Sequence, residues 1–331
     1  MNTLLMISDF AFTRPGIIVG LVVGLVLILF GANYLVDGAS SIAKKFGLSQ
    51  FVIGLTIVGI GTSTPEMVVS FMSAIQDKAT MAIGNIVGSN ILNTFLILGL
   101  TAVISPLMIT RDNIRKDIPL NIGATVLLVL LGMKHSIFGL GSDELSRWDG
   151  ALFLLIFLIY MWKSFTSKQV GETDNDEDDI ELYPIWMSLV FIISGLAGLI
   201  LGGRVFVTNA VRLAQEFEVS EKFIAITIMA LGTSLPELAT CIVAALKGRG
   251  QLALGNVLGS NIFNIILILG GASMISPLSY TGISVVDSFV VVLSAALIFM
   301  ASFTFKKRTI DRVEGLIFLG IEVAYIWYLF L

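Results

Sequence analysis

Ten long apolar stretches, each about 17 to 26 residues long, dominate this chain of 331 residues. Such a stretch predicts a transmembrane helix, because crossing ~30 Å of hydrocarbon takes ~20 helical residues. The stretches are apolar on all sides and lack the alternation of a membrane β-strand, so helices are expected. The predicted spans are 16–38, 50–75, 82–104, 117–133, 148–166, 184–207, 222–246, 252–275, 284–304 and 312–331. The sequence therefore predicts an all-α integral membrane protein with ten transmembrane helices.

The composition excludes most other classes of protein. Hydrophobic residues make up 56% of the chain and charged residues 13%, whereas a soluble chain is about one quarter charged. Soluble enzymes and nucleic-acid-binding proteins are therefore excluded. The chain has one cysteine and one histidine, too few for zinc, haem or iron–sulfur chemistry, so any bound metal must have oxygen ligands and no cofactor is expected.

Two motifs occur twice at a constant separation. GTSTPE at 61–66 returns as GTSLPE at 232–237, and GNIVGSNILN at 84–93 returns as GNVLGSNIFN at 255–264. Both pairs are 171 residues apart, since 237 − 66 and 264 − 93 give the same number. The duplication gives each unit five predicted spans, an odd number, so the second unit enters the membrane from the opposite side. Inverted repeats of this kind are typical of transporters whose binding site lies near the bilayer midplane.

The repeat also divides the chain into parts. We expect a first five-helix repeat at 1–166, with its motifs at about 50–107, and a second at 184–331, with its motifs at about 221–278. Residues 167–183 join them and include the acidic run GETDNDEDDIE, a predicted solvated cytoplasmic linker that lacks the spacing of a Ca²⁺ loop. Placing both termini outside puts 13 of the 20 Lys and Arg residues inside, which favours this orientation.

Two glutamates lie near the middle of apolar spans. A carboxylate there costs at least ~2.5 kcal/mol, so Glu66 and Glu237 are functional candidates. The alternative is a pair of protonated acids that serve packing, which the duplication inside a matched polar motif disfavours. Pro65 and Pro236 precede them and predict breaks in both helices, because proline removes a backbone hydrogen bond.

Other polar residues recur with the glutamates. Asparagines end both GSN motifs, with serines four residues earlier on the same helix face; an intramembrane asparagine can bind an ion or join helices, and both interpretations stay open. The motif glycines are predicted to let helices pack closely. These residues are the hydroxyl pairs Thr62, Ser63, Thr233 and Ser234, the pairs Ser89, Asn93, Ser260 and Asn264, and the glycines Gly84, Gly88, Gly255 and Gly259.

Together the two repeats supply two carboxylates, two amides and several hydroxyls. Such oxygens suit Ca²⁺, which takes six to eight ligands with flexible geometry. Two negative charges match one Ca²⁺ or can be shared by Na⁺ ions or protons, and competition for one site is the physical basis of exchange. The residues leave open whether Na⁺ or H⁺ is the counter-ion. A channel is less compatible with inverted repeats, and no His or Lys lies near Ser63 or Ser234 to make an intramembrane hydrolase.

The two motif pairs resemble the alpha-repeats of the sodium/calcium exchanger family, within the Ca²⁺/cation antiporter superfamily. The compact length resembles prokaryotic members. The resemblance implies that the first and sixth helices slide across the other eight, and K⁺ coupling is not expected because K⁺-dependent members carry Asp where this chain has Asn264. It implies ion ligands at Thr62, Ser63, Glu66, Ser89 and Asn93, at Thr233, Ser234, Glu237, Ser260 and Asn264, and at the backbone carbonyls of Gly59 and Ala230.

The sequence thus predicts an electrogenic antiporter that exchanges Ca²⁺ for Na⁺ in a prokaryotic inner membrane. The alternative is a Ca²⁺/H⁺ antiporter that uses the same carboxylates. The expected partners are these ions and the lipid bilayer, with no nucleic acid, and the oligomeric state is open. A further acid, Glu322, lies near the centre of the last span without a counterpart in a motif; a protonated, hydrogen-bonded packing role is preferred there over ion transport.

Overall fold

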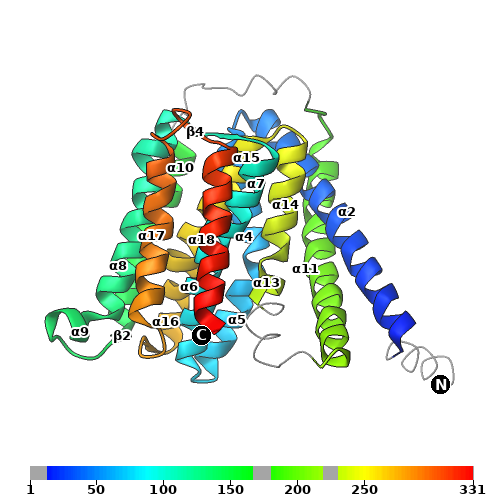
Figure 1. The fold of residues 1–331 in the computed structure, drawn as a ribbon. Helices are drawn as coiled ribbons and strands as arrows, with labels where there is room; N and C mark the ends of the chain where they lie inside the picture. Colours follow the sequence, from blue (N-terminus) through cyan, green and yellow to red (C-terminus); the bar gives the residue numbers. More distant parts are fainter. Residues whose placement is uncertain (1–12, 167–179, 219–229, 331) are drawn as a thin grey trace.

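The computed structural model describes residues 13–166, 180–218 and 230–330 of the chain, and most of them are helical (Figure 1). The elements of the first half are α2 (Arg14–Phe46), α3 (Gln50–Ile53), η1 (Gly54–Val58), α4 (Gly59–Thr62), α5 (Thr64–Ile75), α6 (Ala79–Leu92), η2 (Asn93–Leu98), α7 (Gly99–Ile104), β1 (Leu107–Met108), η3 (Asn113–Asp117), α8 (Ile118–Gly132), α9 (Lys134–Phe138), β2 (Glu144–Leu145) and α10 (Arg147–Thr166). The η elements are π-helices.

The second half repeats much of this order. Its elements are α11 (Ile185–Glu216), α13 (Ala230–Thr233), α14 (Leu235–Leu246), α15 (Gly250–Phe263), the π-helix η6 (Asn264–Leu269), α16 (Gly270–Ile275), β3 (Leu278–Ser279), α17 (Val285–Ala301), β4 (Thr309–Ile310) and α18 (Arg312–Phe330). The short strands pair antiparallel, with Leu107 opposite Ile310 in β1–β4 and Leu145 opposite Leu278 in β2–β3. These pairs join loops of one half to loops of the other.

The first long helix, α2, shows why these sequences form helices of this length. Thr13 caps its start, with the side chain accepting a hydrogen bond from the Gly16 backbone N–H at 3.3 Å. The helix ends at Gly47, whose φ of 64° is the left-handed conformation that glycine adopts without strain. Lys44 and Lys45 occupy the last turn, where the helix dipole favours positive charge.

Helices occupy the described part of every apolar stretch that the sequence marks as a span. Four of them are long and apolar enough to cross a membrane by length and composition alone: α2, α11, Ala79–Ile104 and Gly250–Ile275. The bent pair Gln50–Thr62 and Thr64–Ile75 adds a fifth candidate. The helical membrane-type fold is therefore confirmed, while the full set of ten spans in two inverted repeats stays a prediction.

The duplication is visible in the element boundaries. Helices α6, η2 and α7 begin at residues 79, 93 and 99, and α15, η6 and α16 begin at 250, 264 and 270, so each partner starts 171 residues later. The π-helix η2 thus recurs as η6 in register. A π-turn places one extra residue in a helical turn and occurs frequently at functional sites. The two motif regions therefore share one local backbone geometry.

These motif helices form the centre of the bundle. The apolar window in Gly250–Ile275 is 94% buried and that in Ala79–Ile104 is 72% buried, against 33% for α2 and 28% for α11. Helices α2 and α11 run side by side at one edge of the bundle (Figure 1). Their close approach depends on glycine: a Cβ on Gly195 would lie 2.6 Å from the Leu35 backbone nitrogen.

The motif glycines differ between the two halves. A Cβ on Gly255 would lie 2.3 Å from the Phe51 carbonyl oxygen, and one on Gly259 would lie 2.4 Å from the Leu55 carbonyl oxygen. The predicted packing role is therefore confirmed on α15. On α6, a Cβ on Gly84 would lie 3.8 Å from Cδ1 of Ile283, and one on Gly88 would meet no described atom within 4 Å. Both glycines line a cavity, and their packing role stays a prediction.

Candidate cation-binding site

The two glutamates each follow a break between short helices. Ser63 (φ −79°, ψ 10°) separates α4 from α5, and Ser234 (φ −91°, ψ 5°) separates α13 from α14. A proline follows in the first turn after each break, as predicted, and the first pair of helices is bent by 48°. Glu66 and Glu237 lie in the first turns of α5 and α14, where unpaired backbone N–H groups favour negative charge.

Each glutamate is held by a serine of the other half. The Ser63 hydroxyl donates to Oε1 of Glu237 at 2.9 Å, and the Ser234 hydroxyl donates to Oε1 of Glu66 at 3.3 Å. The Ser63 oxygen also lies 2.9 Å from the Ser260 oxygen. Both carboxyl groups are 1% exposed. The breaks at the two repeats therefore meet face to face in the interior of the bundle.

Four buried oxygens at equivalent positions of the two repeats have no hydrogen-bond partner among the described residues. They are Oε2 of Glu66, Oε2 of Glu237, Oδ1 of Asn93 and Oδ1 of Asn264. An unpaired buried acceptor costs about 1–3 kcal/mol, and more when it is charged. A cation is the ligand that satisfies such oxygens, so this set of four matches a hard-cation site.

The asparagine side chains are oriented by a second pair of asparagines. Nδ2 of Asn93 donates to Oδ1 of Asn261 at 3.2 Å, and Nδ2 of Asn264 donates to Oδ1 of Asn90 at 3.0 Å. Because each amide nitrogen is used in this way, each amide oxygen is left free. The two interpretations of an intramembrane asparagine thus apply to different atoms of one side chain: the nitrogen joins helices and the oxygen is available to an ion.

Another pair of asparagines, Asn85 and Asn256, contacts the helices that carry the two glutamates. Nδ2 of Asn85 lies 3.3 Å from the Glu66 carbonyl oxygen and 3.2 Å from the Ser70 hydroxyl. In the other half, Nδ2 of Asn256 contacts the sulfur of the buried Cys241 at 3.3 Å. Each asparagine thus joins its helix to the helix of a motif glutamate. The constant separation of 171, which pairs Asn85 with Asn256, is the sequence signal for these two residues.

The remaining candidate ligands differ in their described contacts. The Thr62 hydroxyl donates to Oδ1 of Asn256 at 3.1 Å, and Thr233 precedes Ser234, whose hydroxyl donates to Glu66. The Gly59 carbonyl accepts the Ser63 N–H at 3.1 Å, so it already has a partner within the helix. Ala230 is the first described residue of α13. Ser89 is 6% exposed and Ser260 fully buried.

The charge of the two carboxylates is not balanced by a buried base. Within the described ranges, the buried polar residues include neither Lys nor Arg nor His. No group of three or more His, Cys, Asp and Glu residues suited to a metal occurs in these ranges either. An isolated buried carboxylate is strongly disfavoured unless a proton or a cation compensates it. The site therefore requires bound positive charge whenever both acids are ionised.

Comparison with known proteins connects this geometry to a family. The model of the sodium/calcium exchanger protein family matches residues 16–166 and 187–331, which include both copies of the repeated motifs. The chain belongs to the sodium/calcium exchanger family. The resemblance inferred from the motifs is thereby confirmed, and members of this family are exchangers, which agrees with the expectation of a transporter instead of an enzyme.

Individual exchanger-family relatives match almost end to end. CaxA of Alkalimonas amylolytica is 39% identical over 316 residues, covering 93% of this chain and 97% of CaxA. The sodium/calcium exchanger MaX1 of Methanosarcina acetivorans is 33% identical, covering 94% of this chain and 97% of MaX1. The sodium-calcium exchanger NCX_Mj, solved at zero Na⁺ and Ca²⁺, has a TM-score of 0.80 and 31% identity, covering 95% of this chain and 98% of NCX_Mj. This exchanger therefore has the compact layout of its prokaryotic relatives.

Proposed function

We propose that this exchanger is a secondary active antiporter that moves Ca²⁺ against Na⁺ by alternating access, with Glu66 and Glu237 binding the competing cations. The observation that carries the proposal is the set of four unpartnered buried oxygens, two from each repeat. A divalent ion neutralises both carboxylates at once, and the hydroxyls of the broken helices extend the oxygen shell toward the six to eight ligands that Ca²⁺ takes.

Exchange follows from the charge of this site. The carboxylates must be compensated in every state that crosses the membrane, because a bare buried charge is too costly. Either Ca²⁺ or Na⁺ ions can provide that compensation. Among the described residues, no buried Lys, Arg or His competes with them for the carboxylates. Because the site must always hold one cation or the other, the movements of Ca²⁺ and Na⁺ are coupled. The gradient of one ion then drives transport of the other.

The proposed topology has ten spans in two inverted five-helix repeats, residues 1–166 and 184–331, with 167–183 as a cytoplasmic linker. Of the acidic run at 171–181, only Ile180 and Glu181 lie within the described residues. Helix α2 begins and α18 ends at the same end of the bundle (Figure 1). A chain that returns to the side from which it started crosses an even number of times. Together with the bias of basic residues, this arrangement supports a topology with both termini outside a prokaryotic inner membrane.

The experiment that tests this function uses the purified chain in proteoliposomes loaded with Na⁺ and diluted into Na⁺-free buffer with ⁴⁵Ca²⁺. We expect uptake that depends on the outward Na⁺ gradient. A membrane potential that is positive inside the vesicle should stimulate this uptake, because electrogenic exchange carries net positive charge out of the vesicle. Liposomes without protein are the control. Uptake driven by a pH gradient alone would instead support Ca²⁺/H⁺ exchange by the same carboxylates, and no uptake under either gradient would contradict antiport of Ca²⁺.

A further inference from the structure

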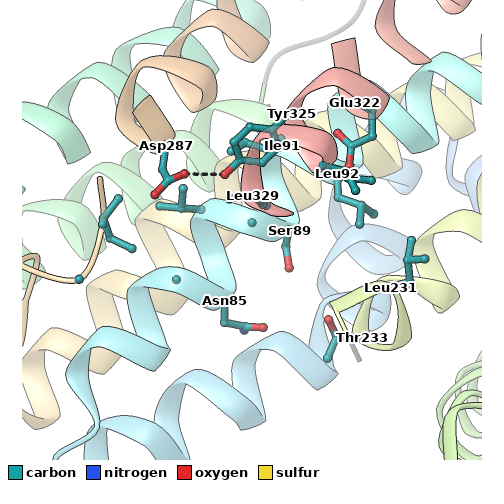
Figure 2. A pocket seen from close by; sticks show the side chains of 16 residues that line it. Asn85, Ser89, Ile91, Leu92, Leu231, Thr233, Asp287, Glu322, Tyr325 and Leu329 are labelled. Atoms are coloured by element: carbon teal, nitrogen blue, oxygen red, sulfur yellow. Dashed lines mark hydrogen bonds between the residues drawn. The ribbon is translucent and has the colours of Figure 1, made fainter. Parts of the chain in front are cut away.

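A cavity of about 350 Å³ lies beside the proposed cation site (Figure 2). Its walls come from α6, α13, α17 and α18 and from the residues that precede α17. The α6 wall contains Gly84 and Gly88, whose missing side chains leave room. The other repeat closes the equivalent face of α15 against the Phe51 and Leu55 backbone. The cavity is thus lined by residues of both halves, with α6 from the first and α13, α17 and α18 from the second.

The cavity reaches the proposed cation ligands. Its lining includes Ser89 of α6 and Thr233 of α13, whose hydroxyls lie on the lower side of the space in Figure 2. Thr233 precedes Ser234, whose hydroxyl donates to Oε1 of Glu66 at 3.3 Å. The cavity therefore extends to the residue next to the serine that binds Glu66.

Glu322 of α18 also lines the cavity (Figure 2). The side chain is 4% exposed, and Oε2 has no hydrogen-bond partner among the described residues. The packing role preferred from the sequence requires such a partner, and the structure gives Oε2 none within the described ranges. A buried carboxylate without a donor is compensated by a proton or a cation, and the cavity beside Glu322 has room for a cation.

The second acid of the cavity is in a different situation. Asp287 accepts a hydrogen bond from the Tyr325 hydroxyl at 2.7 Å and is bound on its other oxygen by the Ser284 backbone N–H and hydroxyl at 2.9 and 2.8 Å. It forms the N-terminal capping box of α17. Its oxygens are therefore occupied, whereas Glu322 retains a free one.

The charged residues that the described part of the chain contributes to the lining have one sign. Glu322 and Asp287 are acids, Tyr325 is the only other titratable lining residue in the described part of the chain, and that part contributes no Lys, Arg or His to the wall. A cavity lined by one sign of charge with apolar walls concentrates counter-ions and raises their arrival rate by about 10- to 1,000-fold. This cavity therefore favours cations over anions.

We propose that Glu322 is a transient cation-binding residue. A cation would bind to it in this cavity before reaching Glu66 and Glu237. The inference rests on the proposed function, since it adds a step to transport by that site. It assigns Glu322 a role in capture, whereas the two motif glutamates bind the ion that is carried. Removing the Glu322 charge must then weaken capture at low Ca²⁺ without slowing transport once the site is filled.

The test compares initial rates of Na⁺-gradient-driven ⁴⁵Ca²⁺ uptake over a range of Ca²⁺ concentrations for the wild type, Glu322→Gln and Glu322→Asp. We expect Glu322→Gln to raise the KM for Ca²⁺ about ten-fold, the lower end of the effect of a charged cavity, with kcat within about two-fold of the wild type. Glu322→Asp keeps the charge and should restore KM to within about two-fold. The matched control is Asp112→Asn, which removes one carboxylate from an exposed ion pair with Lys116 and should leave KM unchanged.

Three outcomes separate the proposals. If the wild type shows no Na⁺-dependent uptake, the proposed function fails and the capture role fails with it. If the wild type transports and Glu322→Gln has an unchanged KM, the capture role alone is overturned. If Glu322→Gln and Glu322→Asp lower kcat equally while KM stays constant, Glu322 serves packing, which also overturns the inference. Size-exclusion profiles in detergent verify that each variant is folded before the rates are compared.

Discussion

Replacing Glu66 or Glu237 by glutamine is expected to reduce Na⁺-dependent Ca²⁺ uptake by about a hundred-fold or more. Glutamine has nearly the same shape and can keep the hydrogen bond from the opposite serine through its remaining oxygen. It loses the charge, however, and presents an NH₂ group where Oε2 is unpartnered. Removing one partner of a buried charge pair typically costs 3–5 kcal/mol, and each 1.4 kcal/mol is a factor of ten.

The measurement is the initial rate of ⁴⁵Ca²⁺ uptake into Na⁺-loaded proteoliposomes at saturating Ca²⁺. Glu216→Gln is the matched control, because Glu216 pairs with Arg14 in an exposed ion pair that contributes little. That variant should transport like the wild type. More than one tenth of the wild-type rate in either Glu66→Gln or Glu237→Gln would show that the paired carboxylates are not both required for binding.

Replacing Asn93 or Asn264 by leucine is expected to raise the KM for Ca²⁺ about ten-fold. Leucine has a similar volume but offers no oxygen, so one of the four free acceptors is lost. The substitution also leaves Oδ1 of Asn261 or of Asn90 without its donor. One lost interaction with a charged ligand is worth about 1.5–3 kcal/mol, which corresponds to a factor of about ten or more.

This effect is measured as the Ca²⁺ dependence of the same uptake rate. Asn33→Leu is the control, because the Asn33 side chain donates to the Leu29 carbonyl oxygen of its own helix, α2. Its KM should equal that of the wild type. If Asn93→Leu and Asn264→Leu both kept the wild-type KM, the amide oxygens would be excluded as ligands, and the asparagines would be restricted to joining helices.

The sequence was sufficient for the parts of the site that depend on local chemistry. Proline before each glutamate predicted the helix breaks at Ser63 and Ser234, and both breaks are present. The repeat at a separation of 171 predicted that equivalent residues occupy equivalent elements, which holds for η2 and η6. Local backbone rules and internal symmetry determine these features, and both can be read from residue order.

The contacts between the two repeats could not be predicted in the same way. Nothing in the motif indicates that Ser63 binds the glutamate of the other half. Nor does it indicate that Asn261 and Asn90 accept hydrogen bonds from the Asn93 and Asn264 amides. These pairs are about 170 residues apart and depend on how two helices cross. The cavity at Gly88 was missed for a related reason, because small residues permit close packing without requiring it.

The number of spans shows another limit. The predicted stretch 117–133 corresponds to α8, which has 15 residues and follows the π-helix η3. The stretch 222–246 is described only from Ala230 onward, where it is broken at Ser234. Broken and short helices do not meet a criterion based on continuous length, although transporters place such helices at their binding sites.

The central claim is that one carboxylate from each repeat binds the same ion, and anomalous diffraction from crystals grown with Ca²⁺ tests it most directly. We predict an anomalous peak within about 2.3–2.6 Å of Oε2 of both Glu66 and Glu237, with the Asn93 and Asn264 amide oxygens turned toward the site. A Ca²⁺ peak bound by only one of the two glutamates, or by neither, would contradict the account.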